Sequence, residues 1–257
     1  MYRVGAMIER TFILLDGIGD KMEHTLWNNG IATWDDFLAC SSVPRISTQR
    51  KALYDKDLCK ANANLSVRNG DFFAHRLPGN EHWRLFETFR DDIVYLDIET
   101  TGHFAGNATT VVGLYDGATF KAFVRGKDLT REALASALDG KKMVVTFFGR
   151  GFDIPVLLQE FDISVPPLHF DLCFAGKRLN MHGGLKVIER ELGICRSDDT
   201  QGLSGADAVR LWYRYKRHDD ESALSTLLQY NKEDVVNLEY LASKIFESLK
   251  TKVTGSF

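Results

Sequence analysis

The segment IVYLDIETTG, residues 93–102, decides the fold. Its apolar first half, residues 93–96, is typical of a buried strand. Because side chains alternate between the two faces of a strand, Asp97 and Glu99 point the same way, and their apolar neighbours point into a core. Two adjacent carboxylates repel each other, and a bound cation relieves that repulsion. The segment therefore predicts an acidic strand end, followed by a Thr-Thr-Gly turn where backbone can approach a ligand.

The composition is that of a soluble globular protein and excludes several functional classes. The chain has 257 residues, with 44% hydrophobic and 26% charged residues and a formal net charge of −3. This charge argues against a polycation that coats nucleic acid by charge alone. No apolar stretch reaches the length of a membrane span, and no signal peptide is evident. The four cysteines are scattered, without a Cys-x-x-Cys pair, which predicts free thiols in a reducing cytoplasm.

The chain is expected to have two parts. Residues 1–76 look helical, with helical spacing of apolar residues over 8–15 and N-caps at Thr33 and Ser47. Leu77-Pro78-Gly79-Asn80 is the clearest boundary signal. We therefore predict a helical region over 1–76 and a second domain over 77–257.

The second part has an α/β pattern, with strands first and helices packed on them. Asp116-Gly117 predicts a hairpin turn between two of the strands. Strands are expected over residues 93–96, 110–115, 119–124 and 143–148, and helices over 152–161, 185–192, 206–215, 223–230 and 233–249.

A second acidic element follows the strand expected over 143–148. A Gly-rich turn leads to Asp153, which should lie at a helix N-terminus, where a carboxylate is favoured. An ordinary N-cap is the alternative interpretation.

The third acidic element is Asp234, four residues after Tyr230, so the two share one face of a helix. That face continues as Leu238 and Leu241. A carboxylate beside such an apolar stripe is costly unless it is paired or bound to metal. The alternative is a helix start with ordinary acidic residues and a tyrosine that packs.

Taken together, Asp-x-Glu on a strand, Phe-Asp opening a helix and a late Tyr-x-x-x-Asp resemble the DEDD, or DnaQ-like, 3′–5′ exonuclease superfamily. The tyrosine indicates its DEDDy branch. Residues 80–250 resemble the YprB-like ribonuclease H-like family more closely. The matching pieces also include His169-Phe170-Asp171, Gly183-Gly184-Leu185-Lys186, Ala208-Val209-Arg210-Leu211-Trp212 and Tyr230-Asn231. The resemblance implies a ribonuclease H-like mixed sheet flanked by helices, with a small N-terminal all-α region.

The resemblance also implies a site with two divalent cations, Mg²⁺ or Mn²⁺. Four carboxylates can hold two such ions, which clamp the attacking and leaving oxygens of a phosphodiester. By analogy with the superfamily, Asp97 bridges both ions, Glu99 and Asp234 help to hold the first, and Asp153 acts mainly through water. Tyr230 orients the attacking water, since an unperturbed phenol is a poor base at neutral pH.

Further residues are candidates for contacts with nucleic acid. Thr100, Thr101 and Gly102 follow the first motif and would meet the terminal nucleotide. Relatives commonly have an apolar residue where this chain has His103, and an asparagine where it has Phe148. Whether these two residues contact the substrate is therefore left open. Lys186 and Arg150 can each neutralise a phosphate or be solvated, as can Arg196. His169 and Asp171 are expected to be structural.

The N-terminal part contains a short helix-hairpin-helix-like sequence, LDGIGDK over residues 15–21. Its glycines, Gly17 and Gly19, would offer backbone N–H groups to a phosphate. A purely structural helical hairpin is the alternative. A nearby basic set can extend this surface, although charge runs are usually solvated. The set comprises Arg45, Arg50, Lys51, Lys56 and Lys60.

The resemblance thus implies a metal-dependent 3′–5′ exonuclease that acts on DNA or RNA, with single-stranded 3′ ends favoured; the polarity and the strand preference do not follow from the residues alone. Two alternatives stay open at this point: a ribonuclease H-like module that binds nucleic acid without cutting it, and a structure-specific endonuclease with the same metal site. The choice between DNA and RNA, the oligomeric state, the protein partners and the pathway do not follow from the sequence.

Overall fold

The computed structural model describes residues 6–102 and 108–255. A sheet with strand order β3-β2-β1-β4-β5 forms the centre of the second part of the chain. The antiparallel neighbours are β3, β2 and β1, whereas β1, β4 and β5 run parallel, so the sheet is mixed. The strands are β1 (Ile93–Thr100), β2 (Thr109–Tyr115), β3 (Phe120–Val124), β4 (Met143–Thr146) and β5 (Leu168–Asp171). The predicted α/β class is confirmed, as is the predicted hairpin between β2 and β3.

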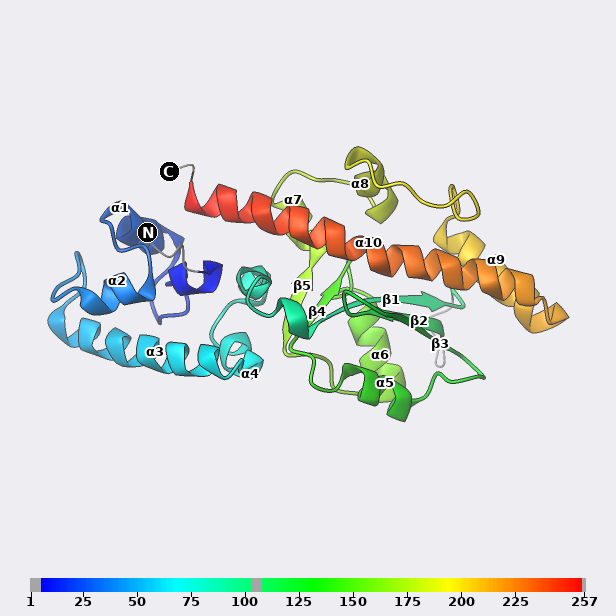
Figure 1. Ribbon diagram of the computed structural model, residues 1–257, viewed down its shortest axis with the longest axis horizontal. Helices are drawn as coiled ribbons and strands as arrows, with labels where there is room; N and C mark the ends of the chain where they lie inside the picture. Colours follow the sequence, from blue (N-terminus) through cyan, green and yellow to red (C-terminus); the bar gives the residue numbers. More distant parts are fainter. Residues whose placement is uncertain (1–5, 103–107, 256–257) are drawn as a thin grey trace.

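Helices cover both faces of this sheet (Figure 1). One face carries α5 (Arg131–Leu138) and α6 (Asp153–Phe161), and the long helix α10 (Glu221–Thr254) crosses the other. Three further helices, α7 (Leu172–Lys177), α8 (Leu185–Glu191) and α9 (Gly205–His218), lie beside α10. Alternation along β1 decides which residues meet which layer. Leu96 and Ile98 pack with α5 and α6, and Tyr95 packs with α10.

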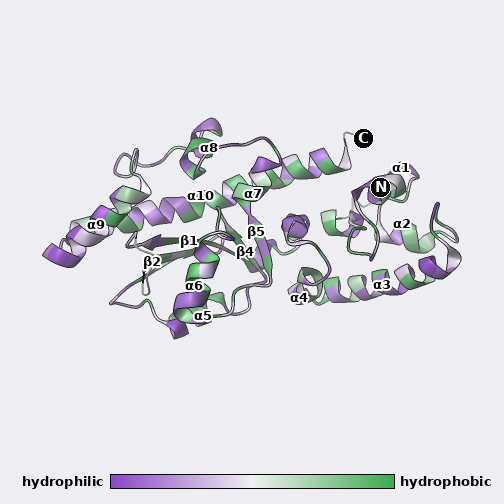
Figure 2. Cartoon of the chain, turned by 180° about the vertical axis from the view of Figure 1, so that it is seen from behind, coloured by the Kyte–Doolittle hydropathy of each residue, from purple (hydrophilic) through white to green (hydrophobic). Residues whose placement is uncertain are grey.

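The N-terminal part contains helices and one isolated β-bridge among its described residues. The α-helices are α1 (Asp20–Asn28), α2 (Trp34–Ala39), α3 (Thr48–Ser66) and α4 (Gly70–Ala74), and the 3₁₀ helices are η1 (Met7–Arg10), η2 (Gly79–Leu85) and η3 (Arg90–Asp92). Thr33 and Ser47 cap α2 and α3 as predicted. Apolar residues recur between polar ones along α3 (Figure 2), and its buried residues are three or four positions apart, as expected for a helix with one buried face.

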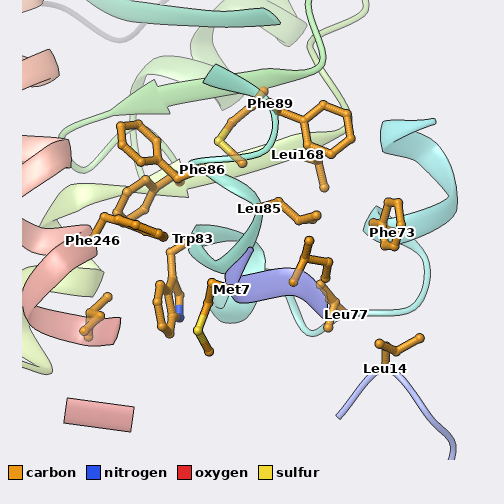
Figure 3. Close-up of a cluster of buried hydrophobic side chains, with 14 of the residues drawn as sticks. Met7, Leu14, Phe73, Leu77, Trp83, Leu85, Phe86, Phe89, Leu168 and Phe246 are labelled. Carbon is orange, nitrogen blue, oxygen red and sulfur yellow. The ribbon is translucent and has the colours of Figure 1, made fainter. Parts of the chain in front are cut away.

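Apolar packing continues from the N-terminal helices into the sheet layer. A single buried cluster includes Met7, Trp83 and Phe246 (Figure 3), and the Trp83 and Phe246 ring centroids are 6.0 Å apart. Within it, the buried Arg84 guanidinium contacts Glu23 at 2.9 Å and Glu81 at 2.7 Å. The division of the chain between residues 76 and 77 stays a prediction, and side chains from both sides of it share this core.

Two predictions about helices are wrong. Residues 8–15 do not form a helix beyond η1, because the buried Glu23 carboxylate accepts hydrogen bonds from the amides of Phe12, at 2.6 Å, and Ile13, at 3.3 Å. The two helices expected over 223–230 and 233–249 are one helix, α10. Its polar middle does not break the helix, because Asn231 bonds to Asp97 on β1 and Asp234 pairs with Arg196.

In the second part of the chain, the sequence analysis missed one strand, β5, and two short helices, α5 and α7. β5 has only four residues and follows Pro166 and Pro167, so its alternating pattern is short. The predicted strand over 143–148 ends at Thr146, where the chain turns toward α6.

Two features bear on the cellular environment. No helix in the described ranges combines the length and the apolar character needed to cross a bilayer. All four cysteines are free thiols. A cytoplasmic location stays a prediction.

Gly113 allows α10 to approach β2. It pairs with Asp97 across the sheet, and a Cβ atom at this position would lie 2.0 Å from Asn231 Oδ1 and 2.9 Å from Val235 Cγ2. Both neighbours belong to α10 and are fully buried. The missing side chain therefore makes room for the helix residues that approach Asp97.

We expect Gly113→Ala to destabilise the fold by about 1–3 kcal/mol, since the added methyl group overpacks the contact between helix and sheet. Urea unfolding monitored by circular dichroism measures this change. Gly205→Ala is the matched control, because nothing lies within 4 Å of a Cβ atom at that position. Equal stability of the Gly113 and Gly205 variants would contradict the role given to Gly113.

Candidate metal centre

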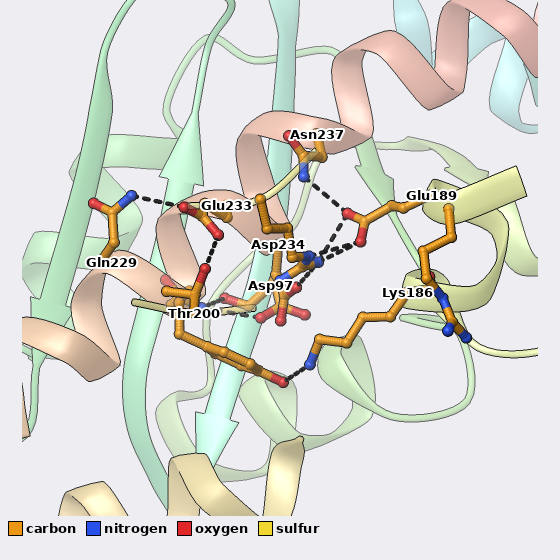
Figure 4. Close-up of polar contacts among 12 residues, drawn as sticks. Asp97, Lys186, Glu189, Thr200, Gln229, Glu233, Asp234 and Asn237 are labelled. Carbon is orange, nitrogen blue, oxygen red and sulfur yellow. Dashed lines mark hydrogen bonds and ion pairs between the residues drawn. The ribbon is translucent and has the colours of Figure 1, made fainter. Parts of the chain in front are cut away.

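Three carboxylates from two elements meet on the α10 face of the sheet. Asp97 and Glu99 come from β1, and Asp234 comes from α10 (Figure 4 labels Asp97 and Asp234). Each offers one oxygen, and these oxygens all lie within 4.8 Å of one another. Glu99 and Asp234 are buried and Asp97 is half-buried. Alternation along the strand and the position of α10 thus bring together three of the four predicted ligands.

Asp153 approaches the same strand from the opposite face. It is the first residue of α6 and is buried, and its Oδ1 accepts a hydrogen bond from the Ile98 amide at 3.1 Å. Phe152 holds the N-cap position, so an ordinary capping role does not explain Asp153. Since Ile98 lies between Asp97 and Glu99, this bond fixes the start of α6 against the acidic segment.

Burial and mutual repulsion raise the pKa values of these carboxyl groups. Desolvation is the largest cause for Asp97 and Glu99, whose pKa values lie well above their usual range, and the charge of Asp234 adds to it. Burial also raises the pKa of Asp234, against the opposing effect of Arg196, and raises the pKa of Asp153 to about 7. Ionised together, these groups require a compensating positive charge. Oxygen donors in this arrangement fit a hard divalent ion such as Mg²⁺ or Mn²⁺.

Asn231 orients Asp97, a role that the sequence analysis missed. Its side-chain amide donates to Asp97 Oδ2 at 3.0 Å and to the Asp97 carbonyl oxygen at 3.4 Å. The side chain is fully buried, so its geometry is constrained by packing. The available signal was its spacing, because Asn231 lies three residues before Asp234 and shares its helix face.

Tyr230 and Lys186 form a second polar pair at this site. The Lys186 ammonium group donates a hydrogen bond to the Tyr230 hydroxyl and lies 4.0 Å from the ring centroid (Figure 4). Burial raises the pKa of Tyr230 well above its usual value, and the charges of Asp234, Glu99 and Asp97 add to this. The hydroxyl therefore stays protonated at neutral pH and cannot act as a base. Burial lowers the pKa of Lys186, while nearby carboxylates oppose that shift.

Arg196 neutralises part of the acidic cluster. Its guanidinium contacts the Asp234 carboxylate and also Glu189, at 2.7 Å. Asn237 donates to Glu189 at 2.9 Å, so the buried Glu189 is held from α10 as well (Figure 4). The sequence analysis considered Arg196 only as a phosphate ligand, and it did not identify Glu189. Because Arg196 and Asp234 are 38 residues apart in the sequence, no local pattern indicates their ion pair.

A cavity of about 860 Å³ opens beside these groups. Its lining includes Asp97, Lys186, Arg196, Tyr230 and Asp234. Much of the remaining wall comes from α8 and from the loop between α8 and α9. The acidic cluster is therefore reached from a cavity whose wall also carries the cationic side chains of Lys186, Arg190 and Arg196.

The end of β1 leads away from the cluster toward α9. The Thr101 amide donates to the Ala108 carbonyl at 2.8 Å, and the Gly102 amide donates to Thr100 Oγ1 at 3.3 Å. A Cβ atom at Gly102 would lie 3.5 Å from Val209 on α9. The predicted contact at His103 lies outside the described residues. Contacts of Thr100, Thr101 and Gly102 with a nucleotide stay predictions.

The loop between β4 and α6 is held by structural side chains. Asp171 accepts hydrogen bonds from the amides of Phe148, at 3.0 Å, and Arg150, at 2.9 Å. His169 Nε2 contacts Thr146 Oγ1 at 2.8 Å, and burial lowers the pKa of His169 to about 3, so it is neutral. The structural roles predicted for His169 and Asp171 are confirmed.

The predicted hairpin at Gly17 and Gly19 lies in the N-terminal region, at one end of the molecule (Figure 1). Both glycines are exposed, but a short 3₁₀ helix stands where the first helix of the motif would be. The Asp16 carbonyl oxygen accepts hydrogen bonds from Arg50, at 2.9 Å, and from the Tyr54 hydroxyl, at 2.7 Å. Arg50 thus has a structural contact, and nucleic-acid binding by this hairpin stays a prediction.

Comparison with known proteins identifies the class to which this fold and site belong. Residues 94–246 match the sequence model of the RNase H superfamily. Because this match covers more than half of the chain, the protein belongs to the RNase H superfamily. The predicted ribonuclease H-like fold is confirmed. The finer DEDDy and YprB-like assignments stay predictions.

Two solved structures resemble the chain. The family B DNA polymerase of the archaeon Pyrobaculum calidifontis aligns with a TM-score of 0.51 and 16% identity, over 63% of this chain and 25% of the polymerase. At this identity the likeness concerns the fold alone. A structure described as the apo form of a nuclease aligns with a TM-score of 0.45 and 21% identity, over 63% of this chain and 81% of that one. No curated protein matches the chain in sequence.

We expect the metal-free protein to lose stability as the pH rises, through Asp153. Its pKa is about 7 in the folded protein and 3.8 ordinarily, so its contribution is fully present below pH 3.8 and is lost by about pH 7. Urea unfolding in a chelator, from about pH 4 to about pH 7.5, measures this loss. In Asp153→Asn the unfolding free energy should fall less with pH than in the wild type. Glu247→Gln, which changes an exposed residue of α10, is the control and should show the wild-type fall. A fall of equal size in wild type and Asp153→Asn would contradict this prediction.

Proposed function

We propose that this protein is a metal-dependent 3′–5′ exonuclease that hydrolyses phosphodiester bonds of DNA or RNA at single-stranded 3′ ends. The observation that carries the proposal is the meeting of Asp97, Glu99 and Asp234, with Asp153 bonded to the same strand. Membership of the RNase H superfamily supports a nucleic-acid substrate. The order of the motifs along the chain supports the DEDDy branch and its polarity of cleavage.

The metal ligands in this proposal are Asp97, Glu99, Asp153 and Asp234, which would hold two divalent ions. When bound, Mg²⁺ or Mn²⁺ supplies Lewis-acid stabilisation of the phosphodiester and lowers the pKa of bound water. Asn231 holds the Asp97 carboxylate in one orientation through its 3.0 Å hydrogen bond. This restraint reduces the reorganisation needed when a cation binds.

Tyr230 and Lys186 act on the substrate side of the site. The Tyr230 hydroxyl keeps its proton, so it orients the attacking water through hydrogen bonds and does not take up a proton. Its bond with Lys186 fixes the phenol and places a positive charge in the cavity. That charge suits an anionic phosphodiester more than a neutral substrate. The sequence left open whether Lys186 neutralises a phosphate or is solvated, and we assign it to phosphate binding.

A 5′-labelled single-stranded oligonucleotide tests the proposal. With Mg²⁺ or Mn²⁺, a ladder of one-nucleotide steps is expected, and a chelator should abolish it. Absence of cleavage of DNA, RNA and hybrid substrates by folded protein would reject the nuclease function. Binding without cleavage would identify a binding module, and cutting of a closed circle would identify an endonuclease.

We expect Asp97→Asn to lower the cleavage rate by at least about 10³-fold, because it removes a charge that metal binding requires. Tyr230→Phe should retain binding and lose about 10- to 100-fold in rate, since it removes only the orienting hydroxyl. Single-turnover cleavage measures both effects. Glu247→Gln is the control with an exposed carboxylate on the same helix as Asp234. Wild-type rates in Asp97→Asn would contradict the assigned site.

A further inference from the structure

Two exposed aromatic rings lie together on the surface next to the loop that leads to Asp153. Phe148 is 44% exposed and Phe174 is 41% exposed. Their ring centroids are 5.8 Å apart, with 33° between the planes. Phe148 comes from the loop between β4 and α6, and Phe174 comes from α7. Two elements distant in sequence therefore present one apolar surface to solvent.

The backbone is strained to keep Phe148 in this position. Its φ angle is +66°, in the left-handed region that a bulky side chain rarely adopts. Asp171 holds the conformation through the amides of Phe148 and Arg150. Gly151 gives the ring its space, since a Cβ atom there would lie 2.7 Å from Phe148 Cζ. Strain of this kind persists where the surroundings enforce it, and it is concentrated at functional sites.

Positive charge surrounds the two rings. The Lys177 ammonium group lies 5.1 Å from the centroid of the Phe174 ring. Arg150 is exposed and donates to the Gly79 carbonyl at 3.1 Å. A cavity of about 200 Å³ lies at Phe174, and Arg150 and Arg178 line it. Arg178 is paired with Glu81 at 2.9 Å, whereas Arg150 and Lys177 form no ion pair among the described residues.

The rings are adjacent in sequence and structure to the acidic cluster. Phe147, next to Phe148, lines the large cavity together with Asp97. The loop that carries Phe148 ends at Asp153, and the charge of Asp171 contributes to the raised pKa of Asp153. The loop that carries Phe148 therefore borders the cavity from which the carboxylates are reached.

We propose that Phe148 and Phe174 form a stacking platform for an unpaired nucleobase of the substrate strand, with Arg150 and Lys177 placed to contact the adjoining phosphates. The inference rests on the proposed function and extends it to how the substrate strand is held. Aromatic faces stack with any base, and nearby cations attract the backbone. A protein partner would satisfy the apolar rings but gives no reason for the cations around them.

The platform favours single strands over duplexes. In a duplex the base faces are covered by their neighbours, so stacking on a protein ring requires an unpaired base. The platform does not read sequence, because every base has a π-face. Its contribution should appear only with strands long enough to extend from the carboxylates to the rings.

Fluorescence anisotropy with a 5′-labelled oligothymidine of about 12 nucleotides tests the platform. Binding is measured in Asp97→Asn protein, so that cleavage does not interfere. Phe174→Leu keeps an apolar side chain but removes the aromatic face, and we expect it to weaken binding by about fivefold or more. Phe148→Ala should have a similar effect. Phe174→Trp keeps an aromatic face and should bind as tightly as the protein with Phe174. A dinucleotide should bind equally to all variants.

Tyr240→Ala is the matched control. Tyr240 is 47% exposed, and Lys244 lies 5.2 Å from its ring centroid, as Lys177 does for Phe174. Thermal melting confirms that each variant is folded. Unchanged affinity in Phe174→Leu and Phe148→Ala would overturn the platform, while cleavage by the wild type would leave the proposed function intact. A wild type that binds no nucleic acid would overturn both, and binding without cleavage would overturn only the nuclease function.

Discussion

The hydrogen bonds between Asn231 and Asp97 set the relation between α10 and the sheet, on which the site depends. They require close approach, and the absence of a side chain at Gly113 permits it. With Asn231 fixed, helical geometry places Asp234 on the same side of α10, beside Asp97 and Glu99. Val235 and Leu238 then enter the apolar layer beneath. The same position of α10 on the sheet therefore buries its apolar residues and brings the three carboxylates together.

A cluster of buried carboxylates is unfavourable, and the fold compensates for only part of it: Arg196 pairs with Asp234, and the charge of Lys186 opposes the raised pKa of Glu99. Arg196 pairs with Asp234 and Glu189, and Lys186 lies against Tyr230. Both cations come from α8 or from the segment that follows it, so the charge balance depends on a part of the chain outside the sheet. Asp97 and Glu99 have no ion pair with either cation in the described residues. Their repulsion is left for a bound cation to relieve, which is the electrostatic condition for a metal site.

Local patterns predicted much of this structure, and contacts between distant segments account for the rest. The alternation at Asp97 and Glu99 and the four-residue spacing of Tyr230 and Asp234 are local, so the sequence was sufficient to place them. The role of Glu23 was not predicted. Its carboxylate accepts hydrogen bonds from the amides of Phe12 and Ile13, and no short sequence pattern indicates such a contact. The Arg196 ion pairs and the role of Asn231 likewise require the approach of α8 and α10 to be known. The sequence therefore predicted which carboxylates come together better than it predicted which residues hold them in place.

Asp171 links the interior chemistry to the surface of the molecule. Its carboxylate accepts three amide hydrogen bonds, from Phe148, Arg150 and Cys173, which join the end of β4 to the start of α7. The strained conformation of Phe148 persists because this buried acceptor, which follows from the position of β5 beside β4, compensates for it. The same loop continues directly into Asp153. Asp171 thus braces the loop that places the Phe148 ring at the surface, and the same loop leads to the Asp153 carboxylate at the start of α6.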